Sequence, residues 1–305
     1  MRAESGVPTV SVCVPTFNRA RYLSVTIESV LAQTFRNYEL IVCDNGSTDD
    51  TPRVVQAFGD ARIRHLRASS TLGMGANWRR GLEAARGRYC AILADDDTWA
   101  PTLLETLLAP LEDDPRADIA FCDHFIMDAD GRVLEDATDD CSRGYGRAGL
   151  RPGLHLPFLE LAVRWQAVWH GAALFRRARA LDTGAVEPRA NTVVDFYLSA
   201  RLALGGGGAI YVPSRLAYVR RHEGSSLATS GAQIWADVGW VCTQLSRDVP
   251  PGPLARVVRD RWAWASFREG ISLCRQGRYL SGLRAAGRGL RLGGVWTPFR
   301  RSRAR

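Results

Sequence analysis

The fold is decided by the stretch Tyr89-Cys90-Ala91-Ile92-Leu93-Ala94-Asp95-Asp96-Asp97, in which an apolar run ends in three adjacent acids. A short apolar run of this kind is typical of a buried strand. Three neighbouring like charges repel one another and would weaken a closed core, so we expect them at the carboxyl end of the strand, beside a divalent cation. Mg²⁺ and Mn²⁺ prefer such oxygens and commonly share them with substrate phosphates. An alternative interpretation is a solvated acidic turn that caps the helix starting near Pro101.

Strand and helix patterns alternate on both sides of this stretch, through roughly the first 125 residues. The predicted strands are 10–14, 39–43, 63–66, 89–94 and 119–122, and the predicted helices are 21–32, 51–58, 76–85 and 101–111. Such alternation predicts an α/β fold with a doubly wound, mixed but mainly parallel sheet. Ligands of these sheets gather beyond the carboxyl ends of the strands, and the polar clusters 16–18, 44–49 and 95–97 fall there.

The second half has a less regular pattern. Asp130-Gly131 is typical of a hairpin turn, and the Gly-, Asp- and Arg-rich segment 136–153 is predicted to be a surface loop. Strands are predicted at 170–175, 210–212 and 216–219, a helix at 193–204, and only helices from about residue 231. We therefore expect one α/β domain over 1–228, with halves 1–125 and 126–228, followed by a helical region with a basic tail over 229–305.

Composition narrows the class of protein. The chain has 305 residues, 46% of them hydrophobic, which suits a large α/β domain with a helical addition and argues against disorder. No apolar stretch reaches the roughly 20 residues of a membrane-spanning helix, and residues 1–6 lack a signal-peptide core, so a cytoplasmic protein is expected. The seven cysteines form no CxxC pair. Cys13, Cys43, Cys90 and Cys122 each lie inside an apolar strand-like run and are predicted to be buried, reduced thiols.

Positive charge is concentrated at the end of the chain. All 40 basic residues are arginine, the formal charge is +8, and nine arginines follow Glu269 with no further acid. The rest of the chain is close to neutral. A basic tail can meet an anionic membrane surface or only solvent. Nucleic acid is not expected as a partner, because the tail lacks the interleaved aromatic residues of a single-strand platform.

Four ordered segments carry a resemblance to a known family. They are Val10-Ser-Val-Cys-Val-Pro-Thr-Phe-Asn-Arg19, Leu40-Ile-Val-Cys-Asp-Asn-Gly-Ser-Thr-Asp49, Gly73-Met-Gly-Ala-Asn77 and Leu93-Ala-Asp-Asp-Asp-Thr-Trp-Ala-Pro101. The chain resembles the family 2 inverting glycosyltransferases, which have the GT-A fold and use nucleotide-diphosphate sugars. The resemblance is close over residues 8–125 and looser over 165–227.

The resemblance implies a nucleotide-sugar site formed by the ends of the first strands. The residues that it assigns to this site are Pro15, Phe17, Asn18, Arg19, Asp44, Asn77, Arg80, Asp95 and Asp97. Pro15 and Phe17 would flank the base, and Asp44 would accept from its ring N–H. The alternatives left open are core packing for Phe17, a helix cap for Asp44 and a solvated position for Arg80.

The resemblance also implies a metal. Asp96 would ligate Mn²⁺ or Mg²⁺, which bridges the diphosphate, while Asp95 would lie near the ribose and Asp97 on the sugar side. His222, in the string Tyr218-Val-Arg-Arg-His-Glu-Gly, would ligate the metal or contact the diphosphate; a plain structural histidine is the alternative. Family members often carry an acid at the position of Ala94, so this chain departs from the pattern there.

Inverting transfer needs a general base on the acceptor side of the sugar. The family usually places a Glu-Asp pair at the head of a helix, and the matching string here is Thr192-Val-Val-Asp-Phe-Tyr. Asp195 is therefore the predicted base, although Val194 replaces the expected Glu. A plain helix N-terminal carboxylate is the alternative for Asp195. Trp169 and His170 resemble the wall of the acceptor pocket.

Together these features predict a metal-dependent, inverting glycosyltransferase that adds one sugar per encounter from a UDP-sugar to a hydroxyl acceptor. That acceptor could be lipid-linked, and the basic tail could contact a membrane from the cytoplasmic side. A Gln-x-x-Arg-Trp string, which marks processive synthases of this family, is absent. The alternatives are a degenerate sugar-nucleotide-binding scaffold and a nucleotidyltransferase, although residues 15–19 are too poor in glycine for the phosphate loop of the latter.

Overall fold

The first strand shows why the sheet is covered by helices on both faces. The computed structural model describes residues 6–224 and 231–292. Along β1 (Val10–Thr16), Val12 packs with Leu23 and Ile27 of helix α1, whereas the next residue, Cys13, packs with Leu82 of helix α3 on the opposite face. Because successive strand residues point to opposite faces, an almost unbroken apolar strand requires helices on both sides.

The strands of the described residues form a single nine-stranded sheet in the order β3-β2-β1-β4-β8-β6-β9-β5, with β7 paired to β9. The strands are β1 (Val10–Thr16), β2 (Tyr38–Asp44), β3 (Ile63–Arg67), β4 (Tyr89–Ile92), β5 (Thr98–Trp99), β6 (Ala117–Met127), β7 (Gly153–His155), β8 (Ala173–Arg176) and β9 (Gly208–Arg220). β1 to β4 run parallel, and β8 joins them to β6 by antiparallel pairs. The predicted mixed α/β fold is therefore confirmed.

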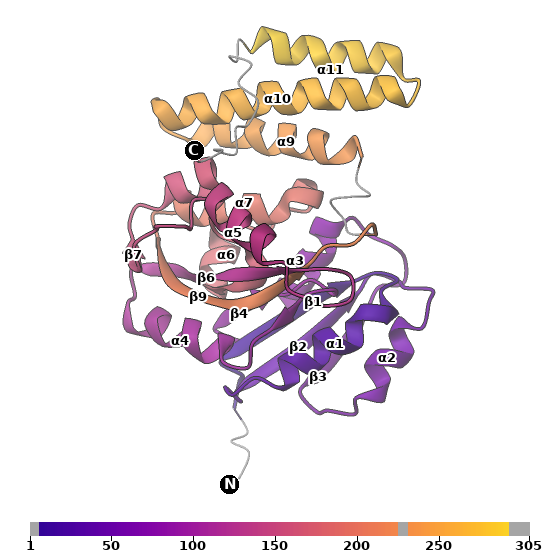
Figure 1. Cartoon of the computed structure of the whole chain (residues 1–305), viewed down its shortest axis with the longest axis vertical. Helices are drawn as coiled ribbons and strands as arrows, with labels where there is room; N and C mark the ends of the chain where they lie inside the picture. Colours follow the sequence, from indigo (N-terminus) through magenta and orange to yellow (C-terminus); the bar gives the residue numbers. More distant parts are fainter. Residues whose placement is uncertain (1–5, 225–230, 293–305) are drawn as a thin grey trace.

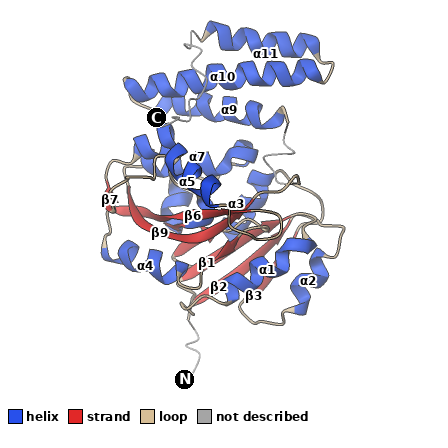
Figure 2. Ribbon diagram, viewed as in Figure 1, coloured by secondary structure: helices blue, strands red, loops and turns tan. Residues whose placement is uncertain are grey.

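Helices lie on both faces of this sheet, and three further helices are stacked at one end of the molecule (Figures 1 and 2). The α-helices are α1 (Ala20–Leu31), α2 (Thr51–Ala57), α3 (Met74–Ala84), α4 (Leu103–Asp113), α5 (Glu135–Gly144), α6 (Arg177–Asp182), α7 (Val194–Leu204), α9 (Gln233–Asp248), α10 (Pro253–Arg275) and α11 (Tyr279–Arg291). Shorter helical turns are η1 (Leu161–Trp165), η2 (His170–Ala172) and η3 (Pro188–Val193). None of the described helices is long and apolar enough to cross a membrane.

The C-terminal helices are held to α7 and to the segment before it by apolar and polar contacts. Phe196 of α7 belongs to the same buried cluster as Val241 and Leu245 of α9. Asp237 of α9, which is buried, accepts hydrogen bonds from the Thr192 hydroxyl at 2.6 Å and the Asn191 amide at 3.2 Å. The helical region therefore shares a core with the segment that leads into α7.

Three expectations for the second half were wrong. The segment 136–153 is not all surface loop, because α5 occupies Glu135–Gly144. The buried residues of α5 are the polar Thr138 and Ser142, so the sequence lacks the periodic apolar residues that predict an amphipathic helix. Acids in its first turn and Arg143 in its last turn interact favourably with the helix dipole.

The predicted strands 210–212 and 216–219 are one strand, β9, whose pairing with β6 shifts where Pro213 and Ser214 lie opposite no partner. In the predicted strand 170–175, residues 170–172 instead form η2. The four cysteines predicted to be buried thiols are buried and unbonded, and the other three are also unbonded.

Candidate active site

The three acids follow β4 in a tight turn and are almost enclosed. Asp95 accepts a hydrogen bond from the Phe17 backbone N–H at 3.3 Å, and Asp97 accepts one from the Arg220 backbone N–H at 2.8 Å. The Asp96 carboxylate lies 2.8 Å from His222 Nε2. The string thus joins the end of β1 to the end of β9, and residues 126 positions apart meet there.

Burial sets the protonation of this string. It raises the pKa of Asp95 to about 7, and the adjacent Asp96 carboxylate adds to the shift. Burial and then the same neighbour raise the pKa of Asp97 well above its usual range. Burial disfavours the charged form of each carboxyl. A string this enclosed is not a solvated acidic turn, because Asp95 and Asp96 are each 9% exposed and Asp97 is 3% exposed. A charged ligand placed here would relieve the repulsion.

The residue types fit a divalent cation. Asp96 and His222 offer an oxygen and a nitrogen 2.8 Å apart, and both side chains are about nine-tenths buried. Within residues 6–224 and 231–292, no three His, Cys, Asp or Glu side chains converge to hold a metal by themselves. Magnesium and manganese sites that act on nucleotides commonly have few protein ligands, because phosphates and water complete the shell. Asp96 and His222 are therefore the residues that would hold the ion.

The loop after β1 is positioned for an exposed ligand. Phe17 is 42% exposed, so core packing does not explain it, and its ring is free to stack on a flat base. Asn18 has a positive φ of 53° and accepts from the Thr48 backbone N–H at 2.8 Å, which ties this loop to the loop after β2. Arg19 lies 4.0 Å from the Asp95 carboxylate and donates to the Gly224 carbonyl. Pro15, one of the last residues of β1, is partly buried.

Asp44 and Asn77 have protein partners for their polar atoms. Asp44 is fully buried, accepts from the Ser47 backbone N–H at 2.8 Å and lies 3.2 Å from His65 Nε2. It therefore does not cap α2. Asn77 donates to the Cys43 carbonyl at 2.7 Å and accepts from Arg80 at 2.9 Å. Asn77 and Arg80 thus fasten α3 to the end of β2, and any contact with a sugar nucleotide stays a prediction.

A second wall of the site is formed by the segment before β8. His170 Nδ1 lies 3.7 Å from the Asp195 carboxylate, in the first turn of α7, and Asp195 is 29% exposed. Trp169 packs on His170 with ring centroids 4.7 Å apart, and its buried Nε1 has no hydrogen-bond partner among the described residues. A Cβ at Gly171 would lie 3.6 Å from Asp97 Oδ2. The predicted acceptor wall therefore adjoins the acidic string.

Sequence reasoning missed several residues that position these groups. The Arg220 guanidinium donates to the Asp96 carbonyl at 2.9 Å and to the Ala129 carbonyl at 3.0 Å. The Tyr22 ring packs on His222 with centroids 4.9 Å apart. Trp99 donates to the Gly171 carbonyl at 2.6 Å. The Trp following the acids was visible in the sequence, but its partner across 72 residues was not.

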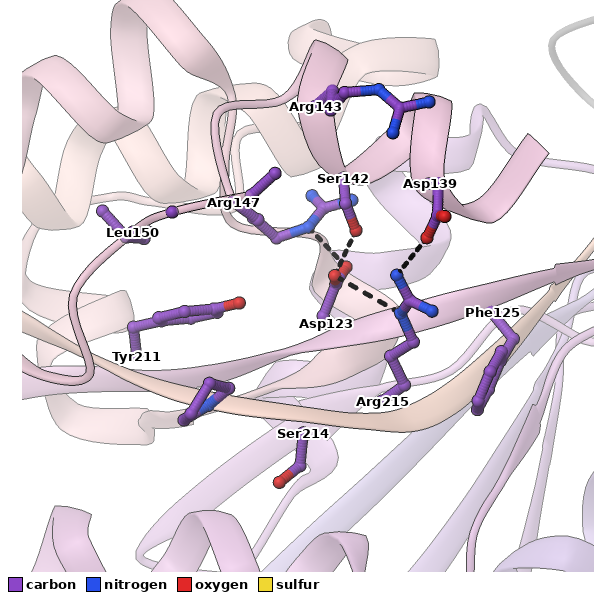
Figure 3. A pocket seen from close by; sticks show the side chains of 13 residues that line it. Asp123, Phe125, Asp139, Ser142, Arg143, Arg147, Leu150, Tyr211, Ser214 and Arg215 are labelled. Carbon is purple, nitrogen blue, oxygen red and sulfur yellow. Dashed lines mark hydrogen bonds and ion pairs between the residues drawn. The ribbon is translucent and has the colours of Figure 1, made fainter. Parts of the chain in front are cut away.

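A cavity of about 740 Å³ opens between α5 and β9, away from the acidic string (Figure 3). None of its lining residues was predicted for the active site. At its centre the Asp123 carboxylate accepts from Arg147 Nε at 2.7 Å and from the Ser142 hydroxyl, and it lies 3.8 Å from Arg215 Nε. Arg215 also pairs with Asp139 at 2.6 Å. Because these charged side chains already have protein partners, we interpret them as a structural ion-pair network that lines the cavity.

The fold and the site define the class. A mixed sheet with helices on both faces and an acidic string after its fourth strand is the GT-A type of glycosyltransferase fold, and the solved structures that this chain resembles have it. The model of glycosyl transferase family 2 matches residues 11–178, more than half of the chain. The chain belongs to glycosyl transferase family 2.

Curated relatives agree with this assignment. An uncharacterised protein of Mycobacterium tuberculosis is 31% identical over 237 residues, which are 73% of this chain and 70% of the relative. The Escherichia coli protein WfgD, named as a UDP-Glc:alpha-D-GlcNAc-diphosphoundecaprenol beta-1,3-glucosyltransferase, is 40% identical over 96 residues. That match spans 32% of this chain and only 38% of WfgD.

Two solved structures share the fold. Staphylococcus aureus TarS, residues 1–349, in complex with UDP has a TM-score of 0.63 at 14% identity, over 93% of this chain and 82% of that one. The mannosyltransferase PcManGT from Pyrobaculum calidifontis, in complex with GDP-Man and Mn²⁺, has a TM-score of 0.61 at 17% identity, over 95% and 77%. At these identities the likeness concerns the fold alone.

Proposed function

We propose that this glycosyltransferase is metal-dependent and inverting, and that it moves one sugar from a nucleotide-diphosphate sugar to a hydroxyl acceptor. The observation that carries the proposal is the 2.8 Å contact between Asp96 and His222, beside two further buried acids. Burial raises the pKa of Asp95 and of Asp97, and a divalent cation bound beside them would stabilise their charged forms. A divalent cation held by Asp96 and His222 would supply that charge to the departing diphosphate.

Asp195 is the proposed general base. Asp195 lies in the first turn of α7, and its partly exposed carboxylate is 3.7 Å from His170 Nδ1. In the proposed step the acceptor oxygen bonds to the anomeric carbon, the bond from that carbon to the diphosphate oxygen breaks, and the hydroxyl proton moves to Asp195. Attack from the face opposite the leaving group inverts the anomeric centre. Trp169 and His170 would orient the acceptor.

UDP is the favoured nucleotide, and a lipid-linked glycan is the favoured acceptor. TarS was solved with UDP and with UDP-GlcNAc, and WfgD is named for a UDP-Glc donor and a diphosphoundecaprenol acceptor. PcManGT, solved with GDP-Man and Mn²⁺, keeps GDP open. Because the chain spans 38% of WfgD, these substrates remain proposals. We place the enzyme on the cytoplasmic side. Of the basic tail predicted to meet the membrane, residues 293–305, with four of the nine arginines that follow Glu269, lie outside the described residues.

A panel of nucleotide-diphosphate sugars with and without Mn²⁺ tests the proposal. Thermal shifts identify the nucleotide that binds the folded chain, because binding raises its apparent stability. Release of nucleotide from the same donor measures turnover. We expect UDP-sugars to give the largest Mn²⁺-dependent shift, together with turnover. Nucleotide binding without turnover of any donor would instead support a non-catalytic scaffold, to which Ala94 and Val194 lend weight.

A further inference from the structure

Helix α11 buries its smallest residues and exposes its largest. Gly282, Ala285 and Gly289 are buried against α10. The exposed fractions of the large apolar side chains are 66% for Tyr279, 75% for Leu280, 67% for Leu283 and 62% for Leu290. An ordinary amphipathic helix on a globular domain has the reverse arrangement, with its leucines toward the core.

Close backbone packing fixes this orientation. A Cβ at Gly282 would lie 2.8 Å from the Gly270 carbonyl oxygen, and one at Gly289 would lie 2.7 Å from the Ala263 carbonyl oxygen. Both distances are shorter than side chains tolerate, so only glycine lets α11 approach α10 this closely. The helix cannot turn its leucines inward without losing that contact. Their exposure is therefore a built feature of the surface.

The exposed leucines adjoin a row of arginines. At 3.6 residues per turn, Leu280, Leu283 and Leu290 share about 100° of the helix surface, and Arg284 and Arg291 border that stripe. Neither arginine has an ion pair within the described part of the chain, whereas Arg288, further round, pairs with Glu269 at 2.7 Å. We call Leu280, Leu283, Leu290, Arg284 and Arg291 the α11 face.

Charge decides what covers this face. No acidic residue follows Glu269, so the α11 faces of two copies would place arginines against arginines. A bilayer with anionic lipid offers an apolar interior beside a negative surface, which matches both halves of the face. In Figure 1, α11 is the outermost helix of the stack and lies at the far end of the molecule from the sheet. It is therefore the helix that can meet a flat surface first.

We infer that the α11 face docks on the surface of a membrane that contains anionic lipid. The helix lies along the interface with its leucines in the headgroup boundary and its arginines at the phosphates. This inference is independent of the proposed function, since it concerns no sugar and no residue of the active site.

Vesicle co-sedimentation of the full chain tests the inference. The probes are vesicles of phosphatidylcholine alone and of phosphatidylcholine with about one quarter phosphatidylglycerol. We expect binding to the anionic vesicles to exceed binding to neutral ones by at least tenfold. Leu280→Ser/Leu283→Ser/Leu290→Ser should weaken anionic binding by about tenfold or more. Arg284→Gln/Arg291→Gln should weaken it by roughly twentyfold, since each arginine near such a surface is worth about fivefold.

Matched variants control for general surface effects. Val7→Ser/Val25→Ser/Leu134→Ser removes exposed apolar side chains elsewhere, and Arg88→Gln/Arg151→Gln removes exposed charges. Both should bind vesicles like the wild type. Equal binding to the two vesicle types, no binding, or full binding by the triple serine variant would overturn the inference. So would a dimer in sedimentation velocity that the triple variant dissolves, because the face would then be a self-association surface.

Discussion

At the scale of single residues, the candidate site brings together three buried acids whose charges repel one another. Asp95 and Asp97 accept hydrogen bonds from backbone N–H groups, whereas the Asp96 carboxylate lies 2.8 Å from His222 Nε2. Such a pair can exchange its mutual hydrogen bond for bonds to a metal. Asp96 is therefore the acid whose loss is predicted to matter most for metal binding.

Asp96→Asn should abolish the Mn²⁺-dependent part of the thermal shift produced by UDP, because an amide is a far weaker ligand for a hard cation. His222→Ala should weaken Mn²⁺ binding by about tenfold or more. The measurement is a Mn²⁺ titration of the melting temperature at saturating UDP. Asp113→Asn, an exposed acid on α4, is the control and should leave the titration unchanged. A normal Mn²⁺ response in Asp96→Asn would contradict the metal assignment.

Asp195→Asn should lower transfer by about 10²-fold or more while the shift with UDP and Mn²⁺ stays at the wild-type value. The reason is that an amide cannot take the acceptor proton but fills the same space near His170. Product formation under saturating donor and acceptor is the readout, and Asp182→Asn, on the surface of α6, is its control. Unchanged transfer would show that another group removes the proton.

At the scale of elements, a buried carboxylate joins the N-terminal strands. Glu39 of β2 accepts from the Ser11 hydroxyl of β1 at 2.7 Å, from Arg64 of β3 at 2.6 Å and from the Arg86 backbone N–H at 2.7 Å. Burial, the largest single influence, acts to raise the pKa of Glu39, but these donors together lower it. The charged form is thus part of what holds β1, β2 and β3 in register.

Glu39→Gln should reduce the free energy of unfolding at pH 7 by about 2–3 kcal/mol, the range for lost hydrogen bonds to a charged group. Since the folded pKa is lowered, the stabilisation is complete above the unfolded pKa of about 4.3 and disappears as pH falls through the folded value. The difference between wild type and variant should therefore shrink below about pH 4 in urea titrations. Glu83→Gln, which removes an exposed pair with Arg79, should cost under about 0.5 kcal/mol. A difference that persists at acid pH would reject the role of the charge.

At the scale of the whole molecule, the C-terminal helices and the proposed base are coupled through one acid. Asp237 receives two donors from Thr192 and one from Asn191, and these residues end the turn that leads into α7 and Asp195. Asn191 also accepts from the Met74 backbone N–H at 2.9 Å, at the start of α3. Helices from three parts of the chain are thus tied together beside the acceptor wall.

Asp237→Ala should lower the free energy of unfolding by about 2–4 kcal/mol, because several buried donors lose their acceptor. It should also lower kcat more than it raises the KM for the donor, since Asp195 is displaced while the nucleotide loops are not. Asp248→Ala, which breaks an exposed pair with Arg201, is the matched control on the same helix and should cost under about 1 kcal/mol. A kcat equal to wild type at full occupancy would contradict this coupling.

The sequence predicted the features that depend on local pattern. The strands from residue 10 to residue 92 and the acid string after β4 were found because apolar runs and like charges are visible along the chain. The sequence did not predict α5, because the residues that this helix buries, Thr138 and Ser142, are polar and give no apolar pattern. The contacts of Asp96 with His222 and of Asp237 with Thr192 join distant segments, and no local period encodes such pairs.

The shared core of α7 and α9 bears on how this protein can be produced. Composition suggests that the chain could be cut near residue 229, yet Phe196 and Tyr197 would then lose Val241, Leu245 and Trp240 as neighbours. A recombinant fragment ending there would expose apolar side chains that α9 normally covers, and we expect it to accumulate in inclusion bodies.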